Sequence, residues 1–220
     1  NAGLKPFIMS GTLLGCIREK RIFEHDKDFD IGIIGWEAQF DVANALLKSD
    51  RFSLNLKNLT GKDLGMLPAM HINSGFSFDI FFFHDKGDHF LHAIDSRTGY
   101  SIYLKNSKFG LIEHEFLGSK FFIPDQYERK LTEHYGSDWR VPNPNYFVTI
   151  ESPALVKKTG HLYAFTLRHE MLKLMNSNAS LEKAKSLVSV IKQNAQKADQ
   201  PKEKILKHFI ECFERADKNS

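Results

Sequence analysis

The sequence contains little cysteine and no long apolar run. Cys16 and Cys212 are its only cysteines in 220 residues, too few for a disulfide framework or a cysteine-based zinc site. A reducing compartment is the simplest expectation. No segment is apolar over the length that a membrane-spanning helix needs, and the N-terminal residues lack the charged-then-apolar pattern of a signal peptide. We expect a cytoplasmic protein, free or peripheral to the inner face of a membrane.

The chain also lacks a large excess of charge of one sign. Its formal net charge is +3 and its pI is about 8.7. Nucleic-acid binding usually needs basic residues clustered on one face, so we expect no nucleic-acid partner. The hydrophobic fraction of 42% and the charged fraction of 26% are typical of a globular protein with a buried core. Because the first residue is Asn1 rather than Met, we also expect further domains of a longer polypeptide.

A small-residue turn opens the most informative stretch of the chain. Ser10, Gly11 and Thr12 precede residues 13–17, whose leucines and isoleucine are spaced for one helical face, with Arg18 beside them. The glycine allows a close backbone approach to a ligand. Two interpretations stay open at this point. The turn is either an ordinary helix cap or an anion site at a helix N-terminus.

An acidic run follows this turn and leads into a predicted strand. Residues 29–34 alternate, so that Asp28 and Asp30 share one strand face, which Asp26 extends if the strand begins that early. Carboxylates two residues apart on a strand lie roughly 7 Å apart and can converge on a divalent ion. Like charges this crowded are costly without a cation or basic partner. The alternative is a solvated acidic loop.

An EF-hand is a second interpretation of the same run. Asp26, Asp28, Asp30 and Glu37 occupy positions one, three, five and twelve of such a loop. The sixth position, however, is Ile31 instead of the glycine that the sharp turn needs, and no second acidic loop of this pattern follows. We therefore consider a calcium-binding module only as an alternative.

Asp79 lies within the apolar run FSFDIFFF, a predicted strand. The strand period places Phe76, Phe78, Ile80 and Phe82 on one face and Asp79 on the other. An unpaired buried charge costs several kcal/mol, so this aspartate needs a partner. A salt bridge to a core arginine would supply one. We favour the other interpretation, a third metal carboxylate on a strand beside the acidic run.

Other segments predict a scaffold around these residues. Residues 84–92 predict a hairpin whose turn is residues 86–88, and because its histidines are expected to be solvated we assign them no metal. Asp125 and Glu128 form a capping-box pattern ahead of a helix that ends at Gly136. Other helices are predicted over residues 36–47, 161–175, 181–196 and 202–216, and other strands over residues 5–9, 52–56, 70–72, 100–104 and 120–123.

Four segments together resemble the LicD and fukutin family of the nucleotidyltransferase superfamily. They are SGTLLGCIR, DKDFDIGI, FDIFFF and IPDQYERKLTEHYGSDWRVP, and they occur in order over about residues 5–144. Within this family, the chain resembles the fukutin-type catalytic domain more closely than the LicD type. It implies an α/β (α+β) fold in which helices flank a mixed nucleotidyltransferase-like sheet. We expect this catalytic domain over residues 1–150 and a helical C-terminal extension over residues 151–220.

The resemblance also implies a site and a reaction. Asp28 and Asp30 correspond to the metal-binding pair and Asp79 to the third acid, with Asp26 as a further metal ligand. Arg18 and the Ser10-Gly11-Thr12 turn correspond to the segment that contacts the donor phosphates.

The implied enzyme is a Mg²⁺- or Mn²⁺-dependent phosphotransferase of surface or capsular polysaccharide synthesis. It moves phosphoribitol, phosphoglycerol or phosphocholine from a CDP-linked donor to a glycan acceptor and releases CMP. Asp79 or Asp26 could be its general base. The alternatives are a nucleotidyltransferase that releases pyrophosphate and the non-catalytic calcium-binding module.

Overall fold

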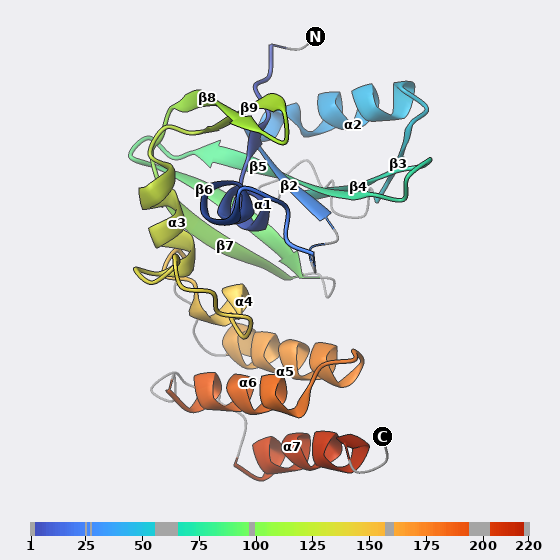
Figure 1. Ribbon diagram of the computed structural model, residues 1–220, viewed down its shortest axis with the longest axis vertical. Helices are drawn as coiled ribbons and strands as arrows, with labels where there is room; N and C mark the ends of the chain where they lie inside the picture. The colour runs from blue at the N-terminus through green and yellow to red at the C-terminus, as the bar shows by residue number, and fades with distance from the viewer. Residues whose placement is uncertain are drawn as a thin grey trace. The chain divides into compact units, whose positions relative to one another are not determined.

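The computed structural model describes the chain as two compact units, residues 1–140 and residues 141–220. Within them it describes residues 3–24, 26, 28–55, 66–96, 100–156, 161–193 and 203–217. The first unit runs from blue to yellow in Figure 1 and the second from yellow to red. Phe147 and Ile150, which the sequence analysis assigns to the catalytic domain, pack in the core of the second unit.

Strands dominate the first unit, with short helices between them. The strands are β1 (Phe7–Ile8), β2 (Asp28–Ile34), β3 (Phe52–Leu54), β4 (Met66–His71), β5 (Ser77–Asp85), β6 (His89–Ser96), β7 (Tyr100–Ser107), β8 (Leu111–Phe116) and β9 (Ser119–Pro124). The helices are α1 (Ser10–Leu14), the π-helical turn η1 (Gly15–Glu19), the 3-10 turn η2 (Trp36–Ala38), α2 (Gln39–Lys48) and α3 (Tyr127–Tyr135).

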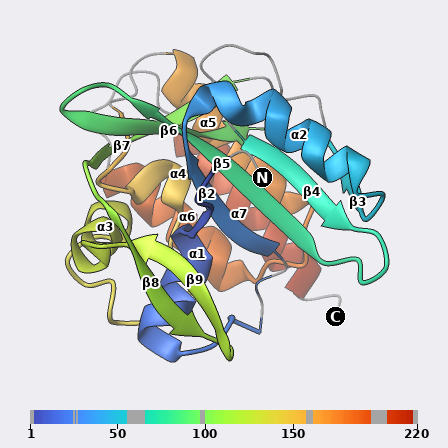
Figure 2. The ribbon, with the colours of Figure 1, turned by 90° about the horizontal axis from the view of Figure 1, so that it is seen from above.

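The strands form one mixed sheet in the order β3-β4-β5-β2-β1-β9-β8, and β6 pairs with both β5 and β7. Two pairs, β2 with β5 and β1 with β9, are parallel, and the other pairs are antiparallel. Figure 2 shows α1, α2 and α3 of the same unit placed around this sheet. The mixed sheet with its flanking helices confirms the α/β fold that the sequence predicts.

The phenylalanine-rich strand β5 is central, and both of its faces are covered. Ile80 and Phe82 pack with Leu67 and with Ala43 of α2. On the opposite face Phe81 and Phe83 join a cluster around Phe7 of β1. Burial on both sides explains why this strand is almost continuously apolar. The face assignment made from the sequence is therefore confirmed.

The predicted hairpin between β5 and β6 is present, with residues 86–88 as its turn. Gly87 has φ 88° and its N–H donates to Asp85 Oδ1 at 2.8 Å. The expectation that its histidines are solvated is wrong for two of them. His84 and His92 are 4% and 1% exposed, because they face the core from the strands and not from the turn.

Helix α3 is present, but the capping box predicted at its start is wrong. The residue before the helix is Gln126, and no side chain caps the helix. Asp125 Oδ1 instead accepts a hydrogen bond from the N–H of Gly110 at 2.9 Å, and Glu128 pairs with Arg140. The carboxylates are thus used for tertiary contacts. The helix ends before Gly136, which has φ 91°, as predicted.

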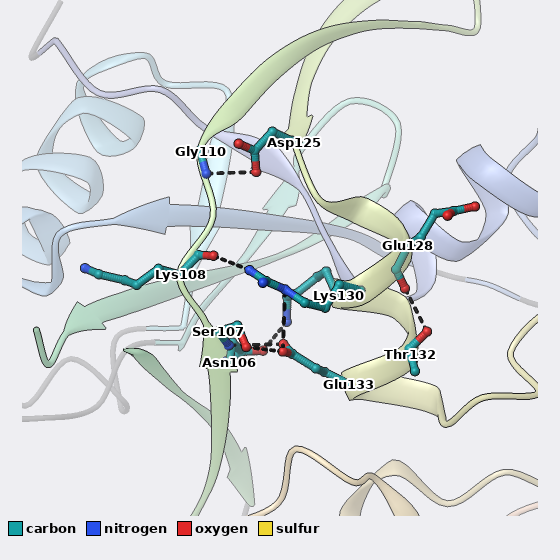
Figure 3. Close-up of polar contacts among 10 residues, drawn as sticks. Asn106, Ser107, Lys108, Gly110, Asp125, Glu128, Lys130, Thr132 and Glu133 are labelled. Carbon is teal, nitrogen blue, oxygen red and sulfur yellow. Dashed lines mark hydrogen bonds and ion pairs between the residues drawn. The ribbon is translucent and has the colours of Figure 1, made fainter. Parts of the chain in front are cut away.

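Further polar side chains attach α3 to the end of β7 (Figure 3). Glu133 accepts hydrogen bonds from the N–H of Ser107 at 3.1 Å and from the hydroxyl of the same residue. Arg129 Nη2 donates to the carbonyl of Lys108 at 2.5 Å. These contacts fix a helix onto a strand that lies about twenty residues earlier in the chain.

A fully buried polar network lies beneath this attachment. Lys130 Nζ donates to Asn106 Oδ1, and Asn106 Nδ2 lies 2.8 Å from His92 Nδ1. His92 stacks on Phe83, with ring centroids 4.5 Å apart, and its other face lies toward His134. Burial lowers the pKa of Lys130 to about 8. Burial, reinforced by the charge of Lys130, lowers the pKa of His134 to about 3.

This network makes the first unit sensitive to acid. Below pH 6.5 the unfolded chain protonates His134 while the folded chain keeps it neutral, so stability falls as pH falls towards 3. Between pH 7 and pH 5 the free energy of unfolding should fall by about 2 kcal/mol more in the wild type than in His134→Phe. Urea unfolding can be followed by the fluorescence of Trp36 and Trp139, the chain's two tryptophans, both of which are in the first unit.

The matched control for this prediction is His114→Phe on β8, since this residue lies outside the buried network. It should leave the pH dependence as it is in the wild type. An equal loss of stability on acidification in the wild type and in His134→Phe would contradict the prediction.

The second unit is helical, as the sequence predicts. Its helices are α4 (Val148–Glu151), α5 (His161–Met175), α6 (Leu181–Gln193) and α7 (Glu203–Asp217). Residues 194–196, predicted to continue α6, lie outside the described residues. One apolar core joins the helices, with Leu167, Leu187 and Phe209 among its members. No described helix in either unit is both long enough and apolar enough to cross a membrane.

Candidate active site

Three aspartates predicted for the site meet where β2 and β5 begin. The two strands are parallel, and Asp30 is in register with Asp79, just as Asp28 is with Ser77. Neighbouring strands lie about 5 Å apart, and in-register residues of such a pair point to the same face. Asp28, Asp30 and Asp79 therefore share one face of the sheet, as the sequence analysis predicts.

The Ser10-Gly11-Thr12 turn is fastened to Asp30. The N–H of Gly11 donates to Asp30 Oδ2 at 2.8 Å, and the N–H of Asp30 donates to Thr12 Oγ1 at 2.8 Å. The helix-cap interpretation of this turn is wrong, because α1 has Met9 at its N-cap and no side-chain cap. In this structure the turn orients a carboxylate, and the N–H of Gly11 is used for that purpose.

Asp26 belongs to the same cluster, although it precedes the strand. A Cβ atom added to Gly11 would lie 3.1 Å from Asp26 Oδ2 and 3.2 Å from Asp30 Oδ2. Both carboxylates therefore lie against Gly11. The strand begins at Asp28, and the N–H of Asp26 bonds to the carbonyl of Phe23 at 3.0 Å. Asp26 thus reaches the cluster from a turn and not, as one expectation had it, by extending the strand.

The cluster is electrostatically strained. Burial raises the pKa of Asp30 well above its ordinary value, and the charges of Asp28, Asp79 and Asp26 raise it further. The hydrogen bond from Gly11 acts in the opposite direction. A bound cation would relieve this repulsion.

The donor set fits Mg²⁺ or Mn²⁺, because both ions prefer carboxylate oxygens. Among the described residues, no group of three or more histidine, cysteine, aspartate or glutamate side chains is arranged so that it could hold a metal ion. The four aspartates are therefore neighbours and not a completed coordination sphere. The EF-hand alternative loses its basis, because Asp28 to Ile34 form a strand paired on both sides and not a loop.

Backbone strain surrounds the turn. Ser10 has φ 44°, a left-handed conformation that costs a residue with a side chain roughly 1 kcal/mol. Immediately after α1 the helix widens into the π-helical turn η1. Such turns are rare and are often found at functional sites. The strain therefore supports a functional role for this part of the chain.

Arg18 belongs to η1, and its side chain already has partners within the protein. Nε bonds to Glu19 Oε1 at 2.8 Å, and Nη1 donates to the carbonyl of Trp139 at 2.9 Å. Neither partner is predictable from the sequence pattern. Residues 135–139 (YGSDW) belong to a segment that carries the family resemblance, and nothing in their residue types indicates a contact with a residue 121 positions earlier.

The fold and the cluster define an α/β protein with a partly buried carboxylate site at the start of two parallel strands. The chain belongs to the LicD/FKTN/FKRP family, because the family model described as "LicD/FKTN/FKRP, nucleotidyltransferase domain" matches residues 3–126. This stretch contains all four aspartates of the cluster and also Arg18.

The chain is also similar in sequence to individual proteins. The chain is 30% identical over 142 residues to ribitol-5-phosphate transferase FKTN of Mus musculus and 28% identical to that of Homo sapiens. Each match covers 64% of this chain but 30% of the relative's length. The uncharacterised protein RT0683 of Rickettsia typhi is 26% identical over 175 residues, 77% of this chain and 52% of that protein.

Proposed function

We propose that this protein is a metal-dependent phosphotransferase. It moves a phospho-alcohol (phosphoribitol, phosphoglycerol or phosphocholine) from a CDP-linked donor to a hydroxyl of a glycan acceptor and releases CMP. The observation that carries the proposal is the register of Asp30 with Asp79, which adds a third carboxylate to the acidic strand. The family match, and the names of its ribitol-5-phosphate transferase relatives, indicate the substrate class.

The carboxylate cluster would hold Mg²⁺ or Mn²⁺. Asp28, Asp30 and Asp79 would be the ligands, with Asp26 as a further one. When bound, the ion would supply positive charge for the donor pyrophosphate and the departing CMP. The N–H of Gly11 holds the Asp30 carboxylate in place, and Thr12 Oγ1 accepts a hydrogen bond from the backbone N–H of the same aspartate. Because this carboxylate is already held in one position, no conformational entropy is lost in ordering it when the donor binds.

In the proposed reaction the acceptor hydroxyl oxygen attacks the phosphorus that carries the alcohol. A new bond forms between these two atoms, and the bond from that phosphorus to the bridging pyrophosphate oxygen breaks. The electron pair of that bond leaves with CMP. The hydroxyl proton goes to Asp79 or Asp26, either of which can act as the general base.

A positive side chain would hold the donor phosphates. Arg18 supplies a guanidinium group, which suits phosphate oxygens. The Ser10-Gly11-Thr12 turn would lie against the donor while it orients Asp30. We place the reaction in the cytoplasm or at the inner face of a membrane, in synthesis of a surface or capsular polysaccharide.

A donor panel tests the proposal. The protein is incubated with Mg²⁺ or Mn²⁺, a sugar acceptor and CDP-ribitol, CDP-glycerol or CDP-choline. CMP release together with the matching mass gain on the acceptor is the expected result, and EDTA should abolish it. Pyrophosphate release from a nucleoside triphosphate, with the nucleotide kept on the acceptor, would instead establish the nucleotidyltransferase alternative.

A further inference from the structure

The guanidinium of Arg18 is held from three sides, although it is proposed to bind a ligand. Arg18 Nε donates a hydrogen bond to the Glu19 carboxylate, and Nη1 donates one to the carbonyl of Trp139. The ring of Phe23 lies beneath the group, with its centroid 5.2 Å from Arg18 Cζ. The side chain is 15% exposed. A long arginine side chain on a surface would normally sample many conformations, and this one is confined to a single arrangement.

The backbone beneath Arg18 is equally specialised. Arg18 lies in the π-helical turn η1, and the residue that follows this turn, Lys20, has φ 58°. A Cβ atom on Gly15 would lie 2.6 Å from the carbonyl oxygen of Arg21, so this close approach needs glycine. Strained backbone of this kind persists where the surrounding structure requires it, commonly at ligand sites.

The remaining edge of the guanidinium is available. Nη2 has no hydrogen-bond partner among the described residues, and it is not among the fully buried polar atoms that lack one. It therefore reaches the surface with two N–H donors. With Nε–H and one N–H of Nη1 in use, the donors left for an anion are the two N–H groups of Nη2 and the second N–H of Nη1.

We propose that Glu19 and the main-chain carbonyl of Trp139 are positioning groups for Arg18. They hold it so that the Nη2 edge meets a phosphate of the CDP-linked donor. The inference rests on the proposed function, and it assigns a role to the YGSDW segment, which is distant in sequence from every acid of the cluster. Removing a positioning group leaves the charge in place but frees the side chain, so donor binding weakens while the chemical step is retained.

Glu19→Ala and Glu19→Gln test this inference. Glu19→Ala should raise the KM for the CDP-linked donor about 10-fold and change kcat less than twofold. Glu19→Gln keeps an oxygen that accepts from Nε and should restore KM to within about threefold. The melting temperature should match the wild type in both variants. Glu24→Ala is the matched control, because Glu24 makes a similar ion pair with Arg21 at 2.9 Å on an exposed surface.

An unchanged KM in Glu19→Ala would overturn the inference, as would equal losses in Glu19→Ala and Glu19→Gln. A direct binding measurement separates this failure from failure of the proposed function. Calorimetric titration with CDP and Mg²⁺ should give about 10-fold weaker binding by Glu19→Ala than by the wild type. If the wild type binds CDP in this way but transfers nothing, the positioning role stands and the proposed reaction fails. If the wild type does not bind CDP, the positioning role is wrong.

Discussion

Asp30→Asn should lower transfer activity by at least about 10³-fold while making the ligand-free protein more stable. Burial and three neighbouring aspartates raise the pKa of Asp30, so its charged form destabilises the fold. Asparagine removes that charge but keeps an oxygen to accept the N–H of Gly11, so the turn stays attached. The loss of activity and the gain of stability have one cause. The negative charge of Asp30 serves the proposed metal site, and it also lowers the stability of the ligand-free protein.

Activity and thermal unfolding should be measured on the same preparations, with EDTA and with Mg²⁺ or Mn²⁺. The cation should raise the melting temperature of the wild type and have a smaller effect on Asp30→Asn. Asp41→Asn, an exposed carboxylate on α2, is the control and should change neither quantity. A fully active Asp30→Asn variant would contradict the proposed metal site.

Gly32→Ala should lower the free energy of unfolding of the first unit by roughly 3 kcal/mol. Gly32 lies opposite Phe7 in the β1–β2 pair, and a Cβ atom there would be 2.2 Å from the ring carbon Cζ. The ring cannot move aside easily. It lies between Phe83 and Phe109, each with its centroid 5.4 Å away.

A second substitution distinguishes this clash from a general effect of glycine replacement. In a Phe7→Leu background the ring is absent, so Gly32→Ala should cost less than about 1 kcal/mol. Urea unfolding followed by tryptophan fluorescence measures all four proteins of this cycle. Additive losses in the double variant would show that the ring contact is not the cause.

Local patterns were sufficient to predict most of the elements. Alternation over Phe29 to Ile34 and over FSFDIFFF predicted β2 and β5, because one residue in two faces the core. Helical spacing in the last third of the chain predicted α5, α6 and α7. Strand β8 was not predicted, because Leu111 to Phe116 alternates weakly, with exposed glutamates between its apolar residues.

Contacts between distant segments were not predictable from local patterns. The capping box predicted at Asp125 is absent, because the carboxylate instead accepts a hydrogen bond from the N–H of Gly110, fifteen residues earlier in the chain. The histidines of the β5–β6 hairpin were expected to be solvent-exposed, yet His92 is part of a buried network with Asn106 and Lys130. A hydrogen-bonding side chain has many possible partners, and only the folded chain selects one.

The sequence by itself determined which residues could carry the chemistry. The spacing of Asp28 and Asp30, and the isolation of Asp79 in an apolar strand, identified carboxylates that need a cation or a basic partner, because strand period and charge repulsion act locally. Only the tertiary structure decided how these groups are placed. The parallel register of β2 with β5 places Asp79 beside Asp30. Asp26 lies against the turn at Gly11, and the carbonyl of Trp139 accepts a hydrogen bond from Arg18. Register and long-range hydrogen bonds depend on the packing of the whole sheet, and no local stretch of residues contains that information.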